Sequence, residues 1–217
     1  MGHEIFLSVG GTSNDEQERF VQAVENRLRA EGLTPNTVGR NKFSVDAPLR
    51  TVEKLMDECV GTVILALERS YFPTGVEKRG GERETSISNI VLPTPWNHIE
   101  AAMAYSRRLP LLVIVQEGLK HEGLLEPGYD WYVQTVPLDE SYLSSSQFNG
   151  LLASWKNKID AKASIKSGAN PIEIIDVSQM TVGQILGALK PSHLWSVLGA
   201  SCAALAGAYA LGAQLWP

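Results

Sequence analysis

The sequence has little cysteine and no stretch that suits nucleic-acid binding. Its two cysteines, Cys59 and Cys202, lie far apart in a chain of 217 residues. This spacing argues against a disulfide framework and favours a reducing compartment. The formal net charge is −5, and no run of Lys and Arg is interleaved with aromatic residues. A partner bound through nucleic-acid phosphates is therefore not expected.

We expect no N-terminal signal peptide, and the sequence has no internal repeats. Its first residues read MGHEIFLSVGG, which is typical of a strand rather than of a basic segment before an apolar run. The length of 217 residues allows one good-sized domain with appendages. We expect neither a metal ion nor a resident cofactor.

Short apolar runs alternate with amphipathic helical patterns along most of the chain. The runs TVILAL at 62–67 and LLVIV at 111–115 are almost wholly apolar, as is typical of strands buried on both faces of a parallel sheet. Helical patterns fill the intervals between such runs. The sequence therefore predicts a flavodoxin-like α/β domain over residues 1–190, with helices on both faces of a parallel sheet and these two strands at its centre.

The segment from Leu194 to Trp216 contains no charged residue. Its length is close to the roughly 20 apolar residues with which an α-helix crosses a bilayer. We therefore expect a transmembrane helix over residues 194–216, which would make this a single-pass protein of the cell membrane with a soluble domain in the cytoplasm. Small residues recur at Gly199, Ala203 and Gly207, a spacing that favours close helix packing in lipid and hence a homo-oligomer. A buried C-terminal helix is the alternative.

Ligands of open parallel sheets bind beyond the carboxyl ends of the strands, so the loops that follow the predicted strands are the candidate site. The first of these loops, Ser8–Ser13, contains Gly10 and Gly11. Paired glycines let backbone N–H groups approach a phosphate or a ribose at the start of the next helix. A plain tight turn is the alternative for this loop.

Two further loops carry polar or aromatic side chains. The loop from Gly39 to Arg50 contains Arg40 and ends on a second cation, and we expect Arg50 to hold ribose or phosphate oxygens. The third loop contains Tyr71, whose ring is suited to stacking on a base. The polar segment behind it, up to Thr94, includes the run GVEKRGGERE and resembles a mobile lid or a disordered excursion.

The fourth loop opens the helix before LLVIV and concentrates candidate side chains. Trp96, Asn97, His98 and Glu100 fall within its first turns. An acid near a helix start often serves only the helix dipole, which is one interpretation of Glu100. The other is a functional carboxylate, favoured by the aromatic, amide and imidazole side chains beside it.

The order of these elements resembles the nucleoside 2-deoxyribosyltransferase-like group and the neighbouring TIR-like folds. The resemblance covers about Glu4 to Glu117 and depends on PLRTVEKLMDECVGTVILAL followed by NHIEAAMAYSRRLPLLVIV. In that group, a Glu at the start of such a helix attacks or stabilises the anomeric carbon of a nucleoside sugar, and Glu100 stands at the matching position. The usual Asp/Asn-x-Gly-Thr approach to this Glu is replaced here by WNHI, and the W-C-x-x-E sequence of TIR-like domains is absent.

The resemblance implies cleavage of the N-glycosidic bond of NAD or a nucleoside-like substrate, in the setting of bacterial antiviral defence. With the predicted tail, the leading hypothesis is a membrane-anchored protein with this activity. Glu100 would be catalytic. The expected substrate-binding residues are Gly10, Gly11, Arg50, Tyr71, Trp96, Asn97 and His98. A second hypothesis is a non-catalytic sensor of a nucleotide signal whose transmembrane helices cluster and disrupt the membrane. A third is a nucleotide-binding scaffold that localises partners to a membrane.

Overall fold

A five-stranded parallel sheet forms the centre of the computed structural model, which describes residues 2–166. The strand order is β2-β1-β3-β6-β7, and every neighbouring pair is parallel. The strands are β1 (His3–Val9), β2 (Leu33–Asn36), β3 (Gly61–Ala66), β6 (Leu111–Gln116) and β7 (Tyr132–Val136).

The two apolar runs form the middle of this sheet, as the sequence predicts. β3 pairs with β1 on one side and with β6 on the other, and all of its residues are buried. Side chains alternate between the faces, so that Val63 and Leu65 join one core and Ile64 and Ala66 join another. Burial on both faces explains why the run shows no polar alternation.

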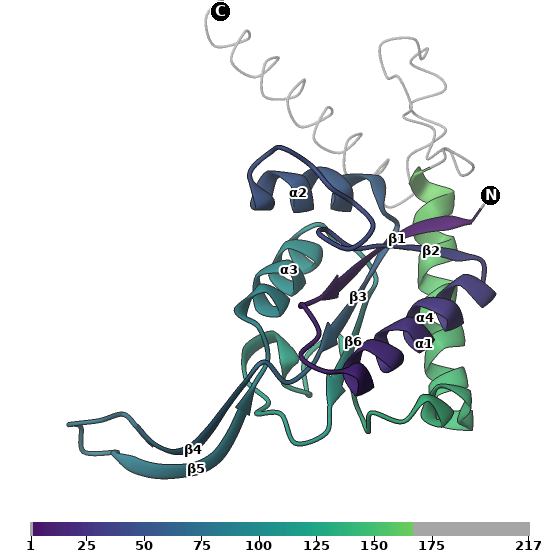
Figure 1. The fold of residues 1–217 in the computed structure, drawn as a ribbon. Coiled ribbons are helices and arrows are strands. Elements are labelled where there is room, and N and C mark those ends of the chain that lie inside the picture. Colours follow the sequence, from purple (N-terminus) through teal and green to yellow (C-terminus); the bar gives the residue numbers. More distant parts are fainter. Residues whose placement is uncertain (1, 167–217) are drawn as a thin grey trace, which may run out of the picture. The chain divides into compact units, whose positions relative to one another are not determined.

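Helices cover both faces of the sheet (Figure 1). α1 (Asp15–Ala30) and α4 (Ser146–Lys166) pack on one face, where Phe20 and Trp155 enter the core. α2 (Pro48–Glu58) and α3 (Pro95–Ser106) pack on the other. Two short 3-10 helices, η1 (Gly123–Leu125) and η2 (Glu140–Ser144), flank β7 in sequence.

The polar segment behind β3 is a β-hairpin, so the expectation of a disordered excursion is wrong. β4 (Ser70–Glu77) and β5 (Thr85–Leu92) form an antiparallel two-stranded sheet that extends away from the domain (Figure 1). Lys120 ties the hairpin to the segment after β6, because its backbone N–H donates to Val91 O at 2.9 Å and its ammonium pairs with Glu77.

The predicted fold class, a flavodoxin-like sheet joined to a transmembrane helix, also needs correction. Within residues 2–166, every helix is too short or too polar to cross a bilayer. The segment 194–216 and the predicted boundary at residue 190 lie outside the described residues. What the structure describes is a mixed α/β arrangement, with a parallel sheet and an antiparallel hairpin. The hairpin is the part of this arrangement that a flavodoxin-like parallel sheet does not contain.

Candidate functional site

A cavity of about 330 Å³ opens at the carboxyl ends of β1 and β3, beside the start of α3. This is the edge of a parallel sheet at which ligands are expected. Four loops or helix starts contribute to its walls. The lining residues are Val9, Gly10, Gly11, Val38, Pro48, Val52, Arg69, Thr94, Trp96 and Glu100.

The local sequence of α3 directs two polar side chains toward the sheet. Thr94 caps the helix, its hydroxyl accepting a hydrogen bond from the Trp96 N–H at 3.4 Å, and Pro95 fits the first helical position. Asn97 and Glu100 lie three residues apart and therefore share one helix face. That face also carries Ala101 and packs on the sheet, so both polar groups are buried.

Glu100 is the chemically distinctive group of this cavity. Its exposed fraction is only 9%, and no basic side chain of the described residues forms an ion pair with it. Burial raises its pKa to about 7, while a hydrogen bond from Ser8 acts in the opposite direction. An acid that serves only the helix dipole would gain by facing water in the first turn. The position of Glu100 favours the functional interpretation.

Ser8 and Asn97 form a hydrogen-bonded chain that ends on Glu100. The Asn97 Nδ2 group donates to Ser8 Oγ at 3.0 Å and to the Leu65 carbonyl at 3.4 Å. Because Ser8 Oγ accepts from the amide, its own hydrogen is available for the Glu100 carboxylate. Asn97 is 1% exposed, so it positions Ser8 rather than contacting a ligand in the cavity.

Half of the predicted site residues meet in this cavity. Gly10, Gly11, Trp96 and Glu100 all line it. The absence of a side chain matters at Gly10, because a Cβ there would lie 3.1 Å from Thr94 Cγ2. The loop after β1 and the start of α3 are thereby in close contact.

Three other predicted residues point elsewhere. Arg50 is exposed on α2, and a helix turn of 3.6 residues places it opposite the cavity-lining Pro48 and Val52. Tyr71 belongs to the hairpin, where its hydroxyl donates to Asn89 Oδ1 at 2.7 Å. His98 lies against η1, with its Nδ1 3.5 Å from the Cβ position of Gly123.

Sequence reasoning missed two residues of the site. Arg69 lines the cavity next to the segment from which Tyr71 was selected, and a cation directly after a buried strand was the available signal. Ser8 is buried in β1, where it follows the apolar residues Ile5, Phe6 and Leu7. A lone hydroxyl at the end of such a run was a signal for a polar contact inside the sheet.

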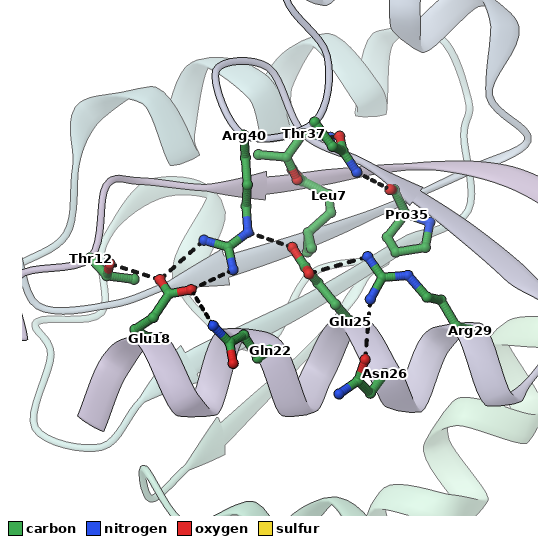
Figure 2. Close-up of polar contacts among 11 residues, drawn as sticks. Leu7, Thr12, Glu18, Gln22, Glu25, Asn26, Arg29, Pro35, Thr37 and Arg40 are labelled. Atoms are coloured by element: carbon green, nitrogen blue, oxygen red, sulfur yellow. Dashed lines mark hydrogen bonds and ion pairs between the residues drawn. The ribbon is translucent and has the colours of Figure 1, made fainter. Parts of the chain in front are cut away.

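Arg40, in the second loop, is held by a polar network on α1 (Figure 2). Its guanidinium donates twice to the Glu18 carboxylate, at 2.7 and 3.1 Å, and once to Glu25 at 2.6 Å. This contact with Arg40 is the main cause that lowers the pKa of Glu18 to about 2. The Arg40 side chain therefore anchors the loop that supplies Val38 to the cavity, and it is not free to bind a ligand.

We expect Arg40→Met to lower the free energy of unfolding by about 1–2 kcal/mol at pH 7 and low salt. Because the pKa of Glu18 is lowered in the folded protein, this stabilisation is fully present at pH values above the unfolded-state pKa of about 4.5. It is lost as the pH falls toward 2. Urea unfolding at pH 7 and at pH 3 measures both effects. Arg29→Met is the control, because Arg29 pairs with Glu25 from an exposed position and should cost about 0.5 kcal/mol or less. Equal losses for the two variants would contradict the anchoring role of Arg40.

Comparisons with known proteins find similarity only among solved structures. No protein-family description matches the chain, and no curated protein matches it. Five chains among solved structures do match. One is a CMP N-glycosidase from Clostridium botulinum, with 14% sequence identity and a TM-score of 0.42, covering 65% of this chain and 95% of that one. The sequence identity is too low for residue roles to be transferred from that protein. Its description does not mention a TIR-like domain, so the TIR-like part of the resemblance has no support from these comparisons.

Proposed function

We propose that this protein cleaves the N-glycosidic bond of a nucleoside or nucleotide, with Glu100 stabilising the reacting sugar carbon. The observation that carries the proposal is a carboxyl group that is 9% exposed, lines a cavity of about 330 Å³ and has a pKa of about 7. Such a group ionises close to neutral pH. Once ionised, it is a largely desolvated charge at the wall of the cavity, where a fixed charge acts strongly.

Cleavage of an N-glycosidic bond is favoured by a negative group close to C1′ of the sugar. When the bond between C1′ and the base nitrogen breaks, its electron pair leaves with the base and positive charge develops at C1′ and the ring oxygen. The ionised Glu100 carboxylate would stabilise that charge. Water then adds to C1′, and the proton that it loses neutralises the departed base through solvent, which completes the hydrolysis.

The cavity lining supports a substrate of nucleoside or mononucleotide size. Its volume of about 330 Å³ is near the lower end of the range of about 300–1,000 Å³ that is typical of ligand pockets. Trp96 is 40% exposed at the cavity and offers a ring on which a base can stack. Arg69 and the backbone of Gly10 and Gly11 suit phosphate or ribose oxygens. NAD would have to extend beyond this volume.

The test is base release by the purified full-length chain. The panel comprises ribonucleosides, 2′-deoxyribonucleosides, their 5′-monophosphates and NAD, and chromatography detects the free base. We expect release from at least one nucleoside or monophosphate, and the same rate from Glu117→Gln, which alters an exposed carboxylate after β6. Binding of these compounds without release of any base would contradict the proposal.

Ser8→Ala should shift the pH dependence of this activity. The Ser8 hydrogen bond lowers the pKa of Glu100, so its removal should raise that pKa further above the ordinary carboxyl range. Activity that requires the carboxylate would then appear at a pH about half a unit to one unit higher, with little loss on the alkaline side. Profiles of kcat/KM from pH 5 to 9 measure the shift, with Ser86→Ala on the hairpin as the control. An unchanged profile would exclude Ser8 as the positioning residue of Glu100.

A further inference from the structure

A second cavity lies at the amino ends of β6 and β7, whereas Glu100 lies near the carboxyl ends of the strands. Its volume is about 610 Å³, and it is lined by the end of α3, the turn into β6, the residues before β7 and one side chain of α4. The residues used below are Tyr105, Arg108, Asp130, Trp131 and Lys158. None of them belongs to the first cavity.

The two cations of this cavity have no protein partner among residues 2–166. Arg108 and Lys158 are exposed, and neither side chain forms a hydrogen bond or ion pair there. By contrast, the adjacent Arg107 pairs with Asp57 and Glu53. The single acid of the cavity, Asp130, accepts a hydrogen bond from the Tyr105 hydroxyl at 3.1 Å. The cavity thus has a net positive charge that suits an anion.

Aromatic rings stand beside these cations. Tyr105 and Trp131 meet edge to face with their centroids 5.3 Å apart, and Tyr129 stacks on Trp131 at 4.8 Å. The Trp131 Nε1–H donates to the Leu124 carbonyl at 3.0 Å, which fixes the indole. A rigid aromatic wall next to paired cations suits a ligand that has a planar ring and a negative group.

Arg108 also occupies a backbone position that favours glycine. Its φ is 53°, in the left-handed region. The Arg108 N–H donates to Tyr105 O and the Leu109 N–H to Ala104 O, which is the helix-ending pattern that usually has glycine at this position. Glycine would relieve the backbone strain there, so local structure gives no reason for an arginine.

We propose that this second cavity binds a mononucleotide. Arg108 and Lys158 take the phosphate, the Tyr105 and Trp131 rings contact the base, and Asp130 accepts a hydrogen bond from a sugar hydroxyl. The proposal is independent of bond cleavage at Glu100, because it concerns binding at another edge of the sheet.

Titration calorimetry with AMP tests the proposal on the full-length chain in the Glu100→Gln background, where any turnover of the probe is at least about 100-fold slower. We expect a class of AMP sites that Arg108→Gly weakens at least 10-fold while the melting temperature stays the same or rises. Lys158→Met should weaken the same class at least about 3-fold. Lys162→Met, one turn further along α4 and outside this cavity, is the matched control and should change it less than 2-fold.

Adenosine and inorganic phosphate separate the two halves of the ligand. Each should bind this class of sites at least 10-fold more weakly than AMP, because each lacks one of the two groups that the cavity contacts. AMP binding that is lost with Trp96→Ala but not with Arg108→Gly would overturn the proposal, since the first cavity would then be the only AMP site detected. Phosphate that binds as tightly as AMP would also overturn it.

Discussion

Glutamine in place of Glu100 is expected to reduce base release at least about 100-fold while the fold is retained. The amide has nearly the shape of the carboxyl group but supplies no negative charge to the sugar carbon. The loss should appear in kcat more than in KM, because the charge is needed where positive charge develops in the transition state.

The comparison is sharpest at pH 8.5, where the parent carboxyl, with its pKa of about 7, is ionised. Turnover of the best substrate from the panel is measured for both proteins, and circular dichroism verifies that the variant is folded. Glu117→Gln, which changes an exposed carboxylate, should retain parental turnover. If Glu100→Gln turned over at the parental rate, Glu100 would not be the catalytic group.

The sheet could be predicted from the sequence because its central strands are buried on both faces. Such strands contain continuous apolar runs, and both TVILAL and LLVIV lie where this rule places them. The hairpin could not be predicted from continuous apolar runs. Both of its strands are largely exposed, so neither face needs to be apolar and the alternation that identifies strands is lost.

The site was predictable at the level of loops but not of individual side chains. The rule for parallel sheets selects the end of the sheet at which the first cavity opens, and Gly10, Gly11 and Glu100 line that cavity. Arg50 failed because a single sequence does not fix which face of α2 meets the cavity. The ion pairs of Arg40 could not be predicted because its partners on α1 are distant in sequence. Long-range polar pairs of this kind leave no local pattern.

Burial of Glu100 should also make the stability of the protein depend on pH. Its pKa is raised from 4.5 to about 7 in the folded state. The contribution of Glu100 to the free energy of unfolding is therefore most favourable below pH 4.5. This contribution is lost as the pH rises through 7. Above pH 7 the parent protein has to hold an ionised carboxylate in a poorly hydrated place.

Glu100→Gln removes this penalty, because the amide is neutral at every pH. The difference in unfolding free energy between variant and parent should increase in favour of the variant by up to about 3 kcal/mol between pH 4 and pH 8.5. For a chain of 217 residues this corresponds to roughly 6–10 °C in melting temperature. Urea unfolding at several pH values measures this difference. For Glu117→Gln, the difference in unfolding free energy from the parent should stay nearly constant with pH.

A variant that is less active but more stable in alkali would show that the carboxylate is kept at the expense of stability, as expected of a functional group. A constant difference for Glu100→Gln would instead mean that this carboxyl is hydrated in the folded protein, which would remove the main support for its proposed role.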